Sequence, residues 1–175
     1  YPYAHKDEYV LEVLSTILGG GMSSRLFLEV REKRGLAYSV HAMVEKYPDT
    51  GYFAVQAGVE HGKLEKAVST ILAEFRKIKK NNKVSGAELK KAKAHIKGTL
   101  TLALETSDAV AAHAATSLIS LGRIRTLEEI IKGIDKVKAG DVMRVAKDLL
   151  RTEGLNLAII GPHLNKENFL TLLRV

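Results

Sequence analysis

The segment that decides the fold is Leu18–Val40, which reads LGGGMSSRLFLEVREKRGLAYSV. Its run of three glycines follows an apolar helical pattern. Because glycine adopts positive φ at little cost, the run predicts a helix end and a sharp turn. Ser23 or Ser24 is expected to cap a second helix, and Gly35 lies at the usual stop position before a strand. The apolar side chains of this second helix fall on one face: Leu26, Phe27 and Val30.

Two residues of this segment carry chemistry that helix and strand formation do not require. Arg31 lies in the last turn of the second helix, where the negative helix end favours a cation. Tyr38 lies near the start of the strand, and the tight turn at Gly35 can bring both side chains to one surface. On spacing alone, the simpler interpretation is structural, with Arg31 paired to an acid and Tyr38 packed in the core with its hydroxyl at the rim.

The composition is that of one folded domain. The chain has 175 residues, of which 46% are hydrophobic, and this is enough for a substantial core. No apolar run reaches the length of a membrane-spanning helix, and the first residues carry charges where a signal peptide needs an apolar stretch. We therefore expect a soluble protein without a membrane partner. These features do not identify the compartment, and a bacterial-type cytoplasm or periplasm is the expectation.

Two further features bound the class of protein. The absence of cysteine excludes a disulfide framework and a thiolate zinc site, and it leaves the compartment open. The chain begins without Met and enters a helical pattern directly, which indicates a piece of a longer protein.

The net charge of +7 raises the alternative of a nucleic-acid-binding module. Much of the excess lies in residues 75–98, which read FRKIKKNNKVSGAELKKAKAHIKG. No aromatic residue after Phe75 interleaves with these lysines to stack on bases. The stretch is better interpreted as a solvated helix end, a polar turn and a solvated helix start, so no nucleic-acid partner is expected.

Periodicity and turn signals predict the remaining elements. Helices are expected at residues 7–18, 62–80, 85–105, 107–121, 126–133, 141–154 and 165–173, and strands at 36–44, 52–59 and 155–162. A turn at 48–51 joins the first two strands into a hairpin. Asn81 and Asn82 break one helix, Gly122 stops another, and Ser107 is expected to cap the helix that it begins. Capping boxes are predicted for two helices: Ser85 with Glu88, and Thr126 with Glu129.

This order of elements predicts one α+β domain over residues 1–175, with a mainly antiparallel sheet covered by helices on one face. The last strand, LNLAIIGP, is apolar throughout and is expected at a buried position of the sheet.

The Leu18–Val40 segment resembles the second-domain motif of the pitrilysin, insulinase and mitochondrial processing peptidase family of zinc metallopeptidases. Such domains carry a run like GGGxSSRLFxEVREKxGLAYSV, and about twenty contiguous positions match here. The resemblance implies that Arg31 and Tyr38 contact substrate across a cavity from a zinc ion that a different domain binds. It also implies a further strand before the first helix, which this chain does not contain.

The chemistry of a zinc peptidase is absent from the chain itself. The catalytic domains of the family bind zinc through HxxEH and a downstream Glu, and none of the six histidines here (His5, His41, His61, His95, His113 and His163) lies in such a motif. The nearest sequence, His5–Tyr9, has Tyr in the final His position. We expect no metal site and no cofactor-binding residues in this chain.

GGGMSSR also lacks the lysine of a phosphate-binding loop. Without a zinc motif of its own, the chain is expected to be inactive alone. The family resemblance implies that it completes an HxxEH site of another domain or subunit, as a homodimer or a heterodimer, on an extended peptide. The alternative is a non-catalytic scaffold of the same fold.

Overall fold

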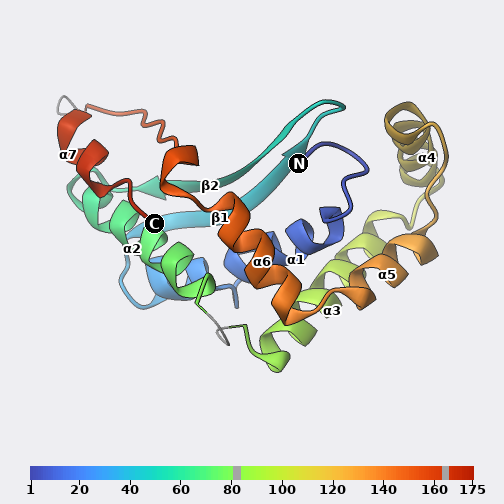
Figure 1. Cartoon of the computed structure of the whole chain (residues 1–175), viewed down its shortest axis with the longest axis horizontal. Helices are drawn as coiled ribbons and strands as arrows, with labels where there is room; N and C mark the ends of the chain where they lie inside the picture. The colour runs from blue at the N-terminus through green and yellow to red at the C-terminus, as the bar shows by residue number, and fades with distance from the viewer. Residues whose placement is uncertain (81–83, 163–165) are drawn as a thin grey trace.

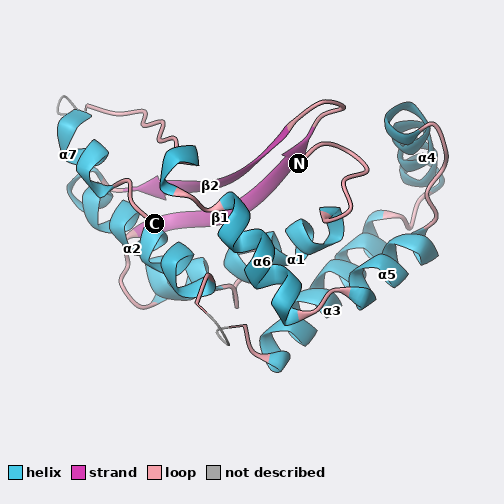
Figure 2. Ribbon diagram, in the orientation of Figure 1, coloured by secondary structure: helices cyan, strands magenta, loops and turns pink. Residues whose placement is uncertain are grey.

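The computed structural model describes residues 1–80, 84–162 and 166–175, and it arranges helices around one hairpin (Figure 1). The helices are α1 (Glu8–Gly19), α2 (Leu64–Ile78), α3 (Gly86–Ala103), α4 (Ser107–Leu121), α5 (Leu127–Lys136), α6 (Ala139–Leu149) and α7 (Lys166–Leu172). A π-helix, η1 (Phe27–Glu32), and two short 3₁₀ turns, η2 (His61–Lys63) and η3 (Thr152–Gly154), complete the helical part. The strands are β1 (Ala37–Lys46) and β2 (Gly51–Val59). The α+β class is confirmed, although the molecule is mostly helical (Figure 2).

Helix α1 is the centre of the core and confirms the helix expected at residues 7–18. It packs against β1, α3, α5 and α6. Its inward face is buried: Val10, Leu11, Val13, Leu14, Ile17 and Leu18. The sequence suggested positive φ in the glycine run that follows, but none of its three glycines adopts it. Gly19 instead allows close packing, because a Cβ there would lie 2.2 Å from the backbone nitrogen of Ala42 in β1.

Strands β1 and β2 form the predicted hairpin. They pair antiparallel from Ala37 opposite Val59 to Lys46 opposite Gly51, and the Tyr47 amide donates to the Thr50 carbonyl at 2.9 Å to close the loop. Helix α2 meets this hairpin at the rings of Phe53 and Phe75, which lie edge to face with centroids 6.0 Å apart.

The strand expected at residues 155–162 is wrong. Residues 155–160 form no strand, and the sheet of the described residues has two strands. A groove of about 720 Å³ lies between Gly51–Val55 of β2 and residues 155–158. Because a strand needs a hydrogen-bonded neighbour, the apolar segment that borders this groove has no ladder to join.

Some of the predicted helix caps and helix stops are confirmed. Thr126 and Glu129 form the predicted reciprocal capping box at the start of α5. Gly122 ends α4 with φ of +69°, as expected. Ser85 caps α3, but the Glu88 carboxylate binds Arg25 instead of completing the box.

Other helix boundaries in the structure differ from the predicted ones. Thr106, and not Ser107, accepts the capping bond of α4 from the Ala109 amide. Helix α6 begins at Ala139 rather than Asp141, and α5 continues past Gly133 to Lys136. The predicted break at Asn81 and Asn82 and the expected helix start at Asn165 lie outside the described residues. No described helix combines the length and apolar character that crossing a bilayer requires.

Candidate functional site

Arg31 lies on a π-helix where the sequence predicted an ordinary α-helix. The Lys33 amide donates to the Leu28 carbonyl at 2.9 Å, five residues back, so the turn is wider than in an α-helix. Val30 anchors the element in the core. The expected serine cap is not formed, because the buried Ser24 Oγ has no hydrogen-bond partner.

Gly35 turns the chain from η1 into β1. Its φ of +55° is in the left-handed region that favours glycine, as the predicted helix stop requires. The Leu36 amide donates to the Val30 carbonyl at 2.8 Å, which holds the end of η1 against the start of β1. The turn therefore fixes the direction in which β1 leaves η1.

Tyr38 lies at an irregularity of the hairpin. Ala37 is opposite Val59 and Ser39 is opposite Gly58, so the register shifts at Tyr38. In a regular strand, neighbouring side chains alternate between faces, but Tyr38 and Ser39 are both exposed. Such a bulge redirects a side chain, and here it leaves the Tyr38 side of the strand open to solvent.

The structure brings Arg31 and Tyr38 together on one surface. The Arg31 guanidinium carbon lies 5.6 Å from the centroid of the Tyr38 ring and 4.8 Å from that of the Phe27 ring. Tyr38 is 85% exposed, which excludes the alternative in which its ring fills the core. Arg31 and Glu32 meet only at 4.0 Å with both side chains exposed, so the alternative of a firm ion pair has weak support.

The neighbouring arginines are bound to carboxylates and serve the structure. Arg25 makes a two-pronged contact with Glu88, at 2.7 Å and 2.8 Å. Arg34 and Lys33 both donate to Glu29, and these bonds lower the pKa of Glu29 to about 2. Arg31 is different, because its close contacts are two aromatic rings.

A shallow depression of about 520 Å³ adjoins Tyr38. It runs between residues 35–38 and residues 58–60, with Lys63 at its border. Lys63 binds Glu60 at 2.7 Å, and this bond lowers the pKa of Glu60. The Tyr38 hydroxyl beside this depression can donate a hydrogen bond to a carbonyl oxygen of a bound molecule. The planar guanidinium of Arg31, next to the Tyr38 ring, supplies further donors.

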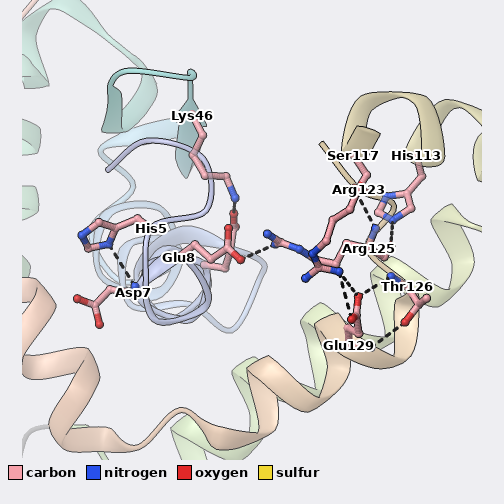
Figure 3. A network of polar contacts seen from close by, with 11 residues as sticks. His5, Asp7, Glu8, Lys46, His113, Ser117, Arg123, Arg125, Thr126 and Glu129 are labelled. Atoms are coloured by element: carbon pink, nitrogen blue, oxygen red, sulfur yellow. Dashed lines mark hydrogen bonds and ion pairs between the residues drawn. The ribbon is translucent and has the colours of Figure 1, made fainter. Parts of the chain in front are cut away.

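The described residues contain no group of three or more His, Cys, Asp or Glu side chains that could hold a metal ion, so they do not fit zinc. In the His5–Tyr9 segment, His5 Nδ1 accepts from the Asp7 amide (Figure 3). Asp7 binds Arg144 at 2.5 Å and 2.9 Å, and Glu8 binds Arg125. These acids are structural partners and not metal ligands. His163 lies outside the described residues.

Residues 1–96 match the family model described as the peptidase M16 inactive domain. The chain belongs to this family. The resemblance to the zinc metallopeptidases found in the Leu18–Val40 segment is thereby confirmed.

Relatives of the M16 inactive domain support the same assignment. An uncharacterized zinc protease of Bacillus subtilis, YmxG, is 36% identical over 158 residues, which are 90% of this chain and 38% of that protein. A protease from Helicobacter pylori has a TM-score of 0.72 and 28% identity over 86% of this chain and 36% of its own. A chain of Complex III2 from Candida albicans shares the fold, with a TM-score of 0.76 and 23% identity over 86% of this chain and 38% of its own. The chain thus spans little more than a third of these proteins.

The sequence did not identify Phe27 as part of the surface that carries Arg31 and Tyr38. Phe27 was expected only on the apolar face of its helix, but it is half-buried with its ring under the Arg31 guanidinium. The four-residue spacing from Phe27 to Arg31 is the signal that could have found the contact.

Proposed function

We propose that this chain is the substrate-binding half of an M16 zinc peptidase, in which Arg31 and Tyr38 hold backbone carbonyl oxygens of an extended peptide. The observation that supports this most is the placement of the Arg31 guanidinium 5.6 Å from the Tyr38 ring, with both side chains on an open surface. Neither group has a strong acid partner among the described residues, so their donors are directed to solvent.

The chemistry of peptide hydrolysis gives these donors a role. Negative charge develops on the scissile carbonyl oxygen, and fixed donors that point at this oxygen lower the barrier. The Tyr38 hydroxyl supplies one such donor, and the planar guanidinium of Arg31 can hold a neighbouring carbonyl.

The zinc ion of such an enzyme would belong to an HxxEH domain of the same polypeptide or of a partner subunit. The family and the longer relatives named zinc proteases support this arrangement. Whether the halves form a homodimer or a heterodimer depends on which polypeptide carries HxxEH. The bacterial relatives agree with a bacterial cytoplasm or periplasm as its location.

The test is to measure kcat/KM of the full-length protein, with its HxxEH partner, after Tyr38→Phe and Arg31→Ala. Loss of one oxyanion donor costs about 3 kcal/mol, so each variant is expected to lose on the order of a hundredfold. Tyr52→Phe, at another exposed tyrosine, and Arg123→Ala, at an exposed surface ion pair, are the matched controls and should change little. A change below about twofold for both site variants discards the assignment.

The second candidate is a scaffold of the same fold that has lost peptidase chemistry. The fold shared with a chain of Complex III2 keeps this alternative open. The exposed Arg31–Tyr38 pair argues against it, because a scaffold has no need of solvent-directed donors at a bulge. Normal assembly of the full protein with no effect of either site variant on hydrolysis would favour the scaffold.

The family resemblance implies a further strand before the first helix, and we also propose that this strand joins the sheet at the free edge of β2. The groove beside β2 supports this, because its floor is apolar and residues 155–158 border its other side. The Tyr1 carbonyl oxygen lies close to Gly51, which lines the groove: a Cβ at Gly51 would be 2.3 Å from it. A strand seated there would pair with β2 and cover the floor residues: Val68, Ile71, Leu72 and Phe75.

A further inference from the structure

We propose that Phe27 is the positioning residue of this site, and that its ring together with the Tyr38 ring holds the Arg31 guanidinium ready for a peptide carbonyl. The proposal rests on the function proposed above, since it concerns the same surface. Its distinguishing observation is that Arg31 lies within 4.8 Å of one ring centroid and 5.6 Å of another.

The spacing along η1 accounts for the contact with Phe27, because residues four apart on a helical element lie on one side of it. The element is a π-helix, in which the Lys33 amide donates to the Leu28 carbonyl five residues back. π-Helical turns are rare and occur often at functional sites.

The bulge in β1 accounts for the contact with Tyr38. The register shift between Ala37 and Ser39 turns the Tyr38 ring out of the sheet, toward η1. The four-residue spacing on η1 and the bulge in β1 therefore converge on one guanidinium. Either one alone would leave Arg31 with a single ring.

The nature of the contact decides what Arg31 can do. A carboxylate would neutralise its charge and occupy its N–H groups, as Glu88 does for Arg25. Aromatic rings attract a cation through their faces and leave the in-plane N–H groups available. Among the described residues, no hydrogen bond joins the Arg31 guanidinium, and Glu32 approaches only to 4.0 Å. Two rings thus orient the cation without consuming its donors.

The first experiment detects the contact between Arg31 and the two rings by NMR, with selective labelling of arginine Nε in the full-length protein. The ring contacts should displace the Arg31 Nε–H resonance upfield of that of Arg123, which pairs with Glu129 on the surface. Phe27→Leu should remove most of the displacement, and Phe27→Tyr should preserve it. An Arg31 resonance in the unmodified protein that matches Arg123 would overturn the proposal, whether or not a variant folds.

The second experiment reads its consequence for hydrolysis. Because an exposed cation–ring contact has a modest energy, Phe27→Leu should lower kcat/KM by about fivefold, and Phe27→Tyr should restore it. Phe53→Leu, a half-buried phenylalanine whose ring meets Phe75 instead of an arginine, is the matched control and should leave the Arg31 resonance in place.

The two proposals fail in different ways. If Arg31→Ala and Tyr38→Phe leave hydrolysis unchanged, the proposed function is lost even when the Arg31 resonance is displaced. If those variants impair hydrolysis but Phe27→Leu changes neither the resonance nor kcat/KM, only the role of Phe27 is lost.

Discussion

Asp7 and Glu8 lie at the start of α1, and each binds an arginine far along the chain. Asp7 contacts Arg144, 137 residues away along the chain. Glu8 contacts Arg125, 117 residues away (Figure 3). Their position is explained locally, because acidic side chains are favourable at a helix N-terminus. Their distant partners were not predictable, because no local pattern connects residues so far apart.

The Asp7–Arg144 pair predicts a pH-dependent contribution to stability. The hydrogen bonds from Arg144 lower the pKa of Asp7. Such a group stabilises the fold above its unfolded pKa and loses this contribution as pH falls through its folded pKa. Arg144 is half exposed, so Asp7→Asn should lower the free energy of unfolding by about 1–2 kcal/mol at pH 7.

Urea denaturation at several pH values measures this difference. The gap between the original chain and Asp7→Asn should shrink toward zero as pH falls through the lowered pKa of Asp7, where the carboxyl becomes protonated in the folded chain. A gap that is the same at pH 7 and at low pH would show that the carboxylate charge is not responsible.

Gly133 in α5 is required by the packing of its neighbour Tyr9. A Cβ at Gly133 would lie 2.3 Å from the Tyr9 ring. Gly133→Ala should therefore destabilise the fold by about 1–3 kcal/mol through overpacking. Gly98→Ala, in α3 with no atom within 4 Å of the added Cβ, should instead stabilise it by up to about 1 kcal/mol. Thermal unfolding of both variants checks the pair, and equal effects would contradict the packing argument.

At the scale of elements, the sequence predicts what depends on neighbours in the chain. Gly35, Gly122 and the Thr126–Glu129 box have the predicted roles because caps and stops use bonds within one turn. The strand at residues 155–162 fails because strand formation depends on a partner elsewhere in the fold.

The candidate site also combines features set by neighbours in the chain with features set by distant parts of the fold. Arg31 and Tyr38 were identified from a motif, and the Gly35 turn was predicted from local rules. The π-helix and the bulge were not predicted, because both arise where η1 and β1 must fit the buried core around Val30 and α1. Arg31 lies between Phe27, four residues before it on η1, and Tyr38, which the bulge turns outward.

At the scale of the whole molecule, the groove beside β2 is the most informative feature. Helix α2 and residues 149–158 surround an apolar hollow, and one edge of the hairpin faces it. An unpaired strand edge over apolar floor residues is a site for strand addition.

A version of the chain extended by about ten encoded residues before Tyr1 tests the strand. It should unfold at a higher temperature, and the β2 amides that do not bond β1 should exchange more slowly, because a new ladder protects them. A matched control carries an extension of equal length with Pro at alternate positions, which cannot pair along its length. Equal exchange in the two versions would contradict strand addition.

The most direct measurement is a crystal structure of the full-length protein with its HxxEH partner and an uncleaved peptide. The account predicts that the Tyr38 hydroxyl and an Arg31 N–H lie about 2.7–3.1 Å from peptide carbonyl oxygens, on the side of the peptide opposite the HxxEH residues. A bound peptide that leaves both side chains in solvent would contradict it.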